Sequence, residues 1–177
     1  MDRQTFDRLM IDHLAAGQRF AVRLSGGDVA GAEDLLHDAI VRAAQRCDGF
    51  RGESKFTTWL FAIIVNIWRD RVRRRQHEPI VESEQVDAIS SEPIDLAQWA
   101  EVGQVVIERI AQLPDRQREV LILIAFEEMS SAQAAAVLGI SEQNVRVNLF
   151  HARARLKEEL ADYLGESNRE RRRSTTR

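Results

Sequence analysis

Apolar side chains recur at helical intervals along this chain, most clearly between residues 56 and 67. There they stand at i, i+3, i+4, i+7, i+8 and i+11: Phe56, Trp59, Leu60, Ile63, Ile64 and Ile67. This spacing puts them on one buried face of an α-helix that begins near Phe56. The chain has only nine Gly and three Pro, which disfavours a turn-rich all-β fold. We therefore expect an all-α protein.

An acidic segment without periodicity divides the predicted helices into two groups. Residues 78–101 carry seven acids and neither Lys nor Arg, and they include Pro79 and Pro93. Such a segment repels itself and stays extended or partly disordered. We predict two small helical domains, an acidic flexible linker between them and a disordered basic tail, in the order 1–76, 77–97, 98–164 and 165–177.

Each domain contains further helical patterns. In the first, a helix over residues 3–24 is broken by Ser25-Gly26-Gly27, and Asp28 can cap a second helix that ends near Cys47. In the second, helices are expected at 98–112 and at 114–127, with Pro114 in the first turn.

The rest of the C-terminal domain has the pattern of a helix-turn-helix. Ser130 and Gln133 fit a capping box that starts a short helix ending at Leu138. Gly139 allows a tight turn, and Ser141 caps a long helix expected to end near Leu164. In this motif the first turns of the second helix enter the major groove, where Gln, Asn and Arg bind base edges. The residues on that side are Gln143, Asn144, Arg146, Val147, Phe150 and His151. An ordinary solvated face is the alternative, but it fits poorly with outward-facing Val147 and Phe150.

The helix that begins near Phe56 has a polar outer side that combines Arg with nearby aromatic residues. This side carries Asn66, Arg69, Asp70 and Arg73, and Arg71, Arg74 and Arg75 extend its positive end. Guanidinium groups beside aromatic rings suit single-stranded nucleic acid. A buried aromatic core with an Arg run that favours the helix dipole explains the composition equally well. The outer side of the preceding helix, with Asp34, Asp38, Val41 and Arg42, is a solvated face or a partner surface.

Several functional classes are excluded. The four His are scattered, no catalytic motif is present, and the single Cys47 rules out a cysteine zinc cluster. No stretch approaches the roughly 20 apolar residues of a membrane span, and the N-terminus lacks a secretory signal pattern. We expect a cytoplasmic protein without enzymatic activity, cofactor, metal, small-molecule substrate or membrane insertion.

These motifs resemble a known family. The segment Ala32-Glu33-Asp34-Leu35 with Asp38, FRGESKFTTWL at 50–60, and Asn66, Asp70 and Arg73-Arg74-Arg75 resemble region 2 of bacterial sigma-70-family factors of the extracytoplasmic-function (ECF, group IV) type. LPDRQREVLIL at 113–123 and the helix-turn-helix at 130–156 resemble region 4. The resemblance covers most of the chain in order.

The resemblance implies a role for three sets of residues. A core-binding set would contact the clamp helices of the polymerase β′ subunit: Asp34, Asp38, Val41 and Arg42. A −10 set would recognise and open the −10 element: Phe50, Arg51, Lys55, Asn66, Arg69, Asp70, Arg73 and Arg74. A −35 set would read the −35 duplex: Ser141, Gln143, Asn144, Arg146, Val147, Phe150 and His151.

The resemblance also implies partners and regulation. RNA polymerase core (β′ and β subunits), promoter DNA and an anti-sigma protein are the expected partners. Such an anti-sigma protein could hold the chain at the membrane, and the active chain would lie on the nucleoid. One departure is that residues 147–153 lack two basic residues of the family's usual S-R-L-H-R-A-R pattern, which predicts weaker −35 binding with less salt dependence. The alternatives are a stand-alone helix-turn-helix regulator, or a sigma mimic that sequesters an anti-sigma protein.

Overall fold

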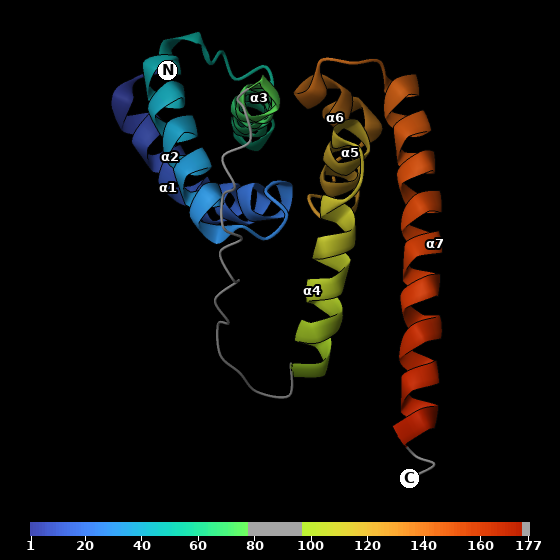
Figure 1. The fold of residues 1–177 in the computed structure, drawn as a ribbon. Coiled ribbons are helices and arrows are strands. Elements are labelled where there is room, and N and C mark those ends of the chain that lie inside the picture. Colours follow the sequence, from blue (N-terminus) through green and yellow to red (C-terminus); the bar gives the residue numbers. More distant parts are fainter. Residues whose placement is uncertain (78–96, 175–177) are drawn as a thin grey trace.

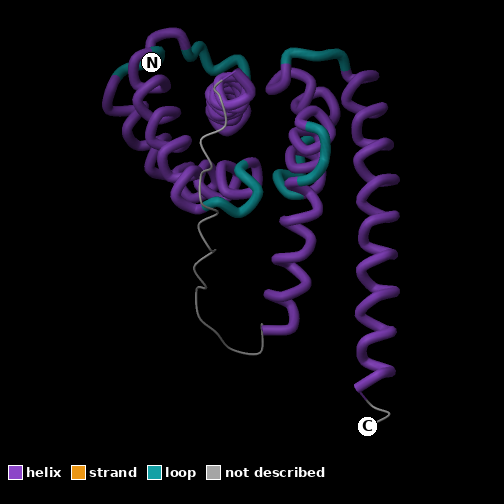
Figure 2. Tube along the Cα trace, in the orientation of Figure 1, coloured by secondary structure: helices purple, strands orange, loops and turns teal. Residues whose placement is uncertain are grey.

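The computed structural model describes residues 1–77 and 97–174, with side-chain burial described for 1–75, 103 and 105–161. These residues are helical apart from short turns (Figure 2), so the predicted all-α class is confirmed. The elements are α1 Arg3–Leu24, α2 Val29–Gln45, the 3-10 helix η1 Cys47–Gly49, α3 Phe56–His77, α4 Ala97–Ala111, α5 Asp115–Ala125, α6 Ser131–Leu138 and α7 Glu142–Ser174. The predicted acidic linker, 77–97, lies outside the described residues except at its two ends, where His77 belongs to α3 and Ala97 to α4.

Helices α1, α2 and α3 form the N-terminal unit. Asp2 and Asp28 cap α1 and α2, each accepting a backbone N–H bond of 2.9 Å. Phe20 of α1 stacks on Phe61 of α3 at a centroid distance of 4.3 Å. Gly17 lets α1 and α2 approach closely, since an added Cβ would lie 3.1 Å from Leu36 Cδ1. The predicted apolar face of α3 is buried or half-buried throughout.

Helices α4 to α7 form the C-terminal unit. The predicted capping box is present, because Ser130 N–H donates to Gln133 Oε1 at 2.9 Å and Gln133 N–H donates to Ser130 Oγ at 3.2 Å. Gly139 adopts a left-handed conformation with φ of 65° and ends α6. Ser141 Oγ then accepts the N–H of Asn144 at 3.2 Å at the start of α7. Pro114 occupies the N-cap of α5 rather than its first turn.

Helix α7 is longer than predicted. It continues to Ser174, through residues expected to form a disordered tail, and it runs along the edge of the molecule (Figure 1). Gly165 had indicated an end to the helix, but one interior glycine costs only about 1 kcal/mol relative to alanine. The residues after Gly165 are rich in Glu and Arg, which are good helix formers, so propagation continues.

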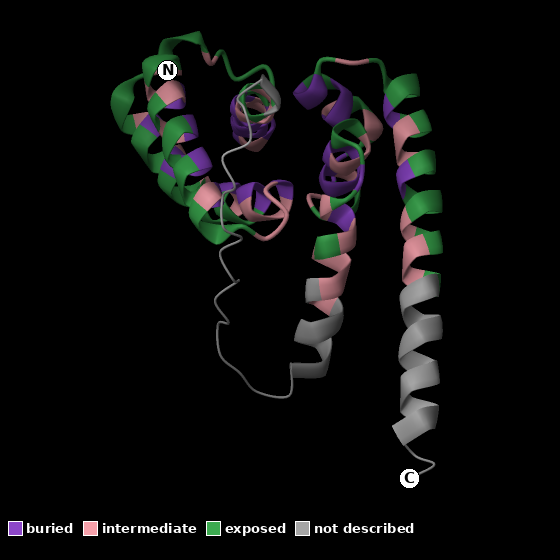
Figure 3. Ribbon diagram, viewed as in Figure 1, coloured by how far each residue is buried: buried purple, intermediate pink, exposed green. Residues whose placement is uncertain are grey.

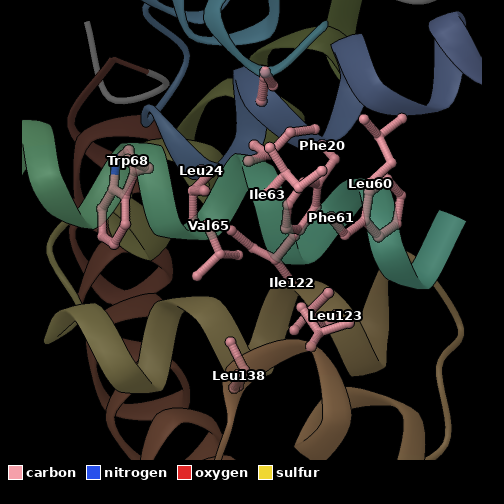
Figure 4. Packing of buried hydrophobic residues seen from close by; sticks show 14 of the residues in the cluster. Phe20, Leu24, Leu60, Phe61, Ile63, Val65, Trp68, Ile122, Leu123 and Leu138 are labelled. Carbon is pink, nitrogen blue, oxygen red and sulfur yellow. The ribbon is translucent and has the colours of Figure 1, made fainter. Parts of the chain in front are cut away.

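The two units pack against each other, which the sequence did not predict. Helix α3 lies between the α1–α2 pair and the α5–α6 pair, and it contacts α2 on one side and α6 on the other (Figure 1). Val65 and Trp68 form a second buried face on α3, with relative exposures of 0% and 6%. Figure 4 shows Val65 reaching from α3 toward α5, where Ile122 and Leu123 lie. The buried residues therefore form one core that spans both units.

Candidate nucleic-acid interface

The first turns of α7 present the −35 set to solvent. Val145 and Ala152 are fully buried against the rest of the C-terminal unit, which fixes the rotation of the helix. The opposite side is exposed, as Figure 3 shows along the outer edge of α7. On that side Val147 is 47% exposed and Phe150 is 70% exposed. An apolar pair left in water beside polar side chains is typical of a binding surface rather than of a solvated helix face.

The polar side chains of the −35 set either contact other side chains of α7 or are exposed to solvent without such a contact shown. Arg146 lies 3.6 Å from Glu142, one turn earlier, and both side chains are largely exposed. His151 packs edge-on to Phe150, with ring centroids 5.5 Å apart. Gln143 and Asn144 are exposed at the N-terminal end. An ion pair this exposed is weak, so Arg146 can exchange Glu142 for a ligand at little cost.

The turn between η1 and α3 forms a small pocket. Phe50 contacts Phe56 edge-on and Trp59 at a tilt, with centroid distances of 5.7 and 5.2 Å. The pocket has a volume of about 160 Å³ and is lined by Gly49, Phe50, Arg51, Glu53, Ser54 and Trp59. Two aromatic faces beside Arg51 offer stacking and one positive charge. Lys55 is exposed at the start of α3.

The outer side of α3 keeps most of its predicted residues available. Asn66 is exposed, and Arg73 and Arg74 are exposed farther along the helix. Asp70 lies 3.3 Å from Arg73 and 4.0 Å from Arg42 of α2. This half-exposed carboxylate therefore orders one basic residue from each helix.

Arg69 lies in a different environment from the rest of the −10 set. Its guanidinium binds both carboxylate oxygens of Glu119 in α5, at 2.6 and 2.7 Å. It also donates to the carbonyl oxygen of Leu138 in α6 at 3.5 Å. Arg69 thus takes part in the contact between the two units and is half-buried, whereas Asn66 and Arg73 are exposed.

The core-binding set lies on the outer face of α2. Asp34 is exposed and Val41 is 44% exposed. Asp38 accepts a bond of 2.5 Å from Arg71 of α3, and Arg71 also donates to the carbonyl oxygen of Gly31 at 3.2 Å. Arg71 of α3 therefore links α3 to α2 through a side chain and a backbone carbonyl of α2.

Sequence reasoning missed Glu119, which is only 1% exposed. It precedes the apolar run Val120 to Leu123 and shares a helical face with Ile122 and Leu123. A charged residue on an apolar face signals a buried partner, so this position could have been singled out. The identity of that partner, 50 positions earlier, is not visible in the spacing.

Other site classes find no support in the described residues. Within them, no helix combines the length and apolar character needed to cross a bilayer. The same residues hold no group of three or more His, Cys, Asp or Glu side chains placed to bind a metal ion.

Comparison with known proteins identifies both units. The family model of Sigma-70 region 2 matches residues 9–78 of this chain. The family model of Sigma-70 region 4 matches residues 103–156. The ECF RNA polymerase sigma factor SigM of Mycobacterium tuberculosis is 32% identical over 155 residues, covering 88% of this chain and 76% of SigM.

Two solved structures share the arrangement of most of this chain. The sigma factor RpoE of Bartonella quintana, in complex with the anti-sigma factor NepR, has a TM-score of 0.73 and 29% identity over 89% of this chain and 98% of its own. CnrH, in complex with the cytosolic domain of CnrY, has a TM-score of 0.67 and 26% identity over 91% and 90%.

The matched regions account for both the N-terminal unit and the helix-turn-helix. A stand-alone helix-turn-helix regulator would leave the region 2 match unexplained. Sigma factors bind RNA polymerase core and are not enzymes. The chain therefore belongs to the extracytoplasmic-function group of the sigma-70 family: it is a sigma factor that directs RNA polymerase to promoters.

Proposed function

We propose that three separate surfaces of this chain divide the work of initiation. The −35 set reads duplex DNA, the −10 set opens and holds the −10 element, and the core-binding set contacts the β′ clamp helices. The observation that carries the proposal is the exposed face of α7, where Val147 and Phe150 are open to solvent in the first three turns of the helix that follows the left-handed turn at Gly139.

The −35 set combines hydrogen-bonding and apolar readout. Gln143 and Asn144 suit adenine edges, Arg146 suits guanine, and an exposed valine or phenylalanine suits the thymine methyl group. Asn148 and His151 stand where the family pattern has arginine, so fewer phosphates are neutralised. We expect this helix to discriminate sequence well while it contributes a shallow salt dependence.

The −10 set suits an unpaired strand. The 160 Å³ pocket beside Phe50 and Trp59 offers aromatic faces for one unstacked base. Arg51 and Lys55 at its edge, with Arg73 and Arg74 on α3, provide charges for the sugar-phosphate backbone. We propose that the pocket captures a base of the non-template strand while α3 holds the strand on either side of it.

The test uses two variants that separate core binding from promoter opening. Asp38→Arg reverses a charge on α2, and we expect it to reduce co-purification with RNA polymerase core. The matched control is Asp12→Arg, which makes the same charge change on the exposed side of α1. Full retention of core by Asp38→Arg, with the control also unaffected, contradicts this role for α2.

The second variant is Asn66→Ala combined with Asp70→Ala. We expect it to bind core normally and to lose promoter opening, because both side chains face outward on α3. Permanganate reactivity of unpaired thymines in the −10 element measures the opening. Unchanged reactivity, together with unchanged transcription from a closed duplex, contradicts the assignment of α3.

We also propose that an anti-sigma protein binds this chain. RpoE and CnrH were each solved with such a partner, NepR and CnrY. Their similarity to this chain covers both units together, which supports a shared closed form as the target. Co-expression with each adjacent gene product that has a small cytoplasmic domain tests the proposal. A stable complex that blocks core binding supports it, and failure of every such product to bind contradicts it.

A further inference from the structure

A cavity of about 120 Å³, which we call the arginine cavity, lies where α2, α3 and α5 meet. It is larger than the roughly 15 Å³ that one water molecule requires. The described residues that line it include three arginines, two from α3 and one from α5: Arg71, Arg75 and Arg118. The three sets defined above for DNA and core polymerase contain none of these arginines.

Arg118 is the most buried of the three, with 15% of its side chain exposed. The carboxylate of Asp115 lies 3.9 Å from its guanidinium, which is beyond hydrogen-bond distance. Its Nε is buried without an acceptor in the described part of the chain. The guanidinium donates to three backbone carbonyl oxygens, which carry no net charge: those of Leu24, Ala111 and Leu113.

Burial lowers the pKa of Arg118 below its usual value, although the charges of Asp115 and Glu119 oppose this shift. An arginine in a protein nevertheless keeps its proton. The side chain therefore carries a full positive charge that no carboxylate of the described residues pairs at hydrogen-bond distance. Because the Nε is buried, Arg118 acts on the cavity through this charge.

The two arginines of α3 differ in their partners. Arg75 is exposed and forms neither an ion pair nor a hydrogen bond with the described residues. Arg71 donates to Asp38 at 2.5 Å and to the carbonyl oxygen of Gly31 at 3.2 Å, so its charge is paired. Two of the three cations around the cavity, Arg75 and Arg118, are therefore left without a short carboxylate contact.

Asp28 is the one acid among the described residues that line the cavity. Its carboxylate caps α2, where it accepts the N–H of Gly31 at 2.9 Å. A carboxylate in this position interacts with the positive end of the helix dipole. Asp28 therefore offsets only part of the charge of Arg75 and Arg118, and the cavity keeps an excess of positive charge.

The rest of the wall favours a small ligand. Leu35 and Trp68 line the cavity with exposures of 1% and 6%, and Figure 4 shows Trp68 on α3. Arg71 and Arg118 are 27% and 15% exposed, so a ligand must enter the recess to reach them. A terminal phosphate group can enter, whereas a phosphate within a nucleic-acid strand carries a sugar on both sides.

We propose that the arginine cavity binds the phosphate group of a small molecule, either free inorganic phosphate or the terminal phosphate of a monoester. Such a group carries a charge of about −1.5 to −2 near pH 7, which would balance Arg75 and Arg118. Guanidinium groups suit it because their planar donors match its oxygens. The bound phosphate would link α3 to α5 and stabilise the folded chain.

The first test is a phosphorus NMR titration of inorganic phosphate with the free full-length chain, at an ionic strength held constant with chloride. We expect saturable binding by the wild type. Arg75→Gln should bind about tenfold more weakly, because it removes an unpaired cation from the wall. The matched control is Arg74→Gln, which removes the same charge from an exposed residue of α3 that does not line the cavity.

The control should keep the affinity of the wild type. Equal losses in Arg74→Gln and Arg75→Gln would show that phosphate binds the arginine run without using the cavity, and would overturn the proposal. An absence of saturable binding by the wild type would overturn it, as would an Arg75→Gln affinity equal to that of the wild type.

Adenosine monophosphate in the same titration distinguishes the two sources of the phosphate group, with adenosine as the control for contacts of the base and ribose. Binding of inorganic phosphate alone supports the proposal and identifies free phosphate as the ligand. Binding of adenosine monophosphate at least as tightly supports it and identifies a monoester. Equal affinities for adenosine monophosphate and adenosine, without binding of inorganic phosphate, overturn it.

A second variant fills the site with a negative charge of its own. Ser25 lines the cavity, and Ser25→Asp places a carboxylate in its wall. We expect this variant to lose the rise in melting temperature that phosphate gives the wild type, because the carboxylate repels the ligand. Gln18→Glu adds the same charge at an exposed site on α1 and should keep the rise.

An undiminished rise in Ser25→Asp, equal to that of Gln18→Glu, would overturn the proposal. These measurements use neither DNA nor core polymerase. Their failure would therefore leave the proposed function untouched, and a failure of transcription with core would leave the phosphate site untouched.

Discussion

At the residue scale, the side chain that departs most from its surroundings is Phe150, a large ring left 70% exposed on a well-packed helix. Exposure at this level means that its removal changes binding more than stability, because little of the ring is buried in the folded chain. The same reasoning applies to Val147 beside it. Both are therefore useful probes of whether this face of α7 meets DNA.

We predict that Phe150→Ala weakens binding to a −35 duplex by about threefold to tenfold, or about 1 kcal/mol, through lost burial against base methyl groups. The melting temperature should be unchanged. Fluorescence anisotropy with a labelled duplex measures the affinity. Ile11→Ala is the control, since Ile11 is equally exposed, at 73%, but lies on α1. The same loss in both variants would contradict a specific role for Phe150.

His151 provides a second prediction, because the family pattern has arginine in its place. His151→Arg should add one phosphate contact and steepen the slope of log K against log salt by about 0.9. Gln18→Arg adds the same charge at an exposed site on α1 and should leave the slope unchanged. Equilibrium DNA titrations at several salt concentrations measure the slope for each variant. An unchanged slope for His151→Arg would show that this residue does not face the backbone.

At the element scale, the helix-turn-helix is positioned by local signals. The capping box at Ser130, the left-handed Gly139 and the cap at Ser141 set where α6 and α7 begin and where the chain turns between them. Each of these signals acts over three or four residues. The starts of α1, α2, α3, α6 and α7 could therefore be predicted from the sequence.

We predict that Ser130→Ala lowers the unfolding free energy of the C-terminal unit by about 1 kcal/mol, since it leaves the N–H of Gln133 without its acceptor. Ser131→Ala, one residue later and inside α6, should change stability much less. Urea unfolding followed by circular dichroism measures both. Equal effects of the two variants would contradict the capping role of Ser130.

Two features of the elements could not be predicted from their spacing. The apolar stripe from Phe56 to Ile67 accounted for one buried face of α3, so Val65 and Trp68 had no assigned partner. Their burial depends on α5 and α6, which lie far along the chain. The continuation of α7 to Ser174 depends on a balance between one glycine and many helix formers, and such a balance is not settled by a single breaker residue.

At the scale of the whole molecule, dependence on distant residues also explains why the ion pair of Arg69 with Glu119 could not be predicted from the sequence. Its position on α3 places it among the −10 residues, and a guanidinium suits phosphate and carboxylate equally. Only the packing of α3 against the C-terminal unit, chiefly against α6, brings it to Glu119 of α5. Local patterns determine which residues share a helix face. Which face packs against another unit depends on contacts between residues far apart in the sequence. The spacing of residues along one helix gives no information about such contacts.

The most direct test of the central claim is transcription itself. Purified RNA polymerase core is given sheared DNA from the source organism with and without this protein, and the RNA 5′ ends are mapped over several rounds of initiation. The account predicts new start sites that share −35 and −10 elements and appear only when the protein is added. An absence of new starts, with protein shown to be folded, would contradict the claim that this chain directs RNA polymerase to promoters.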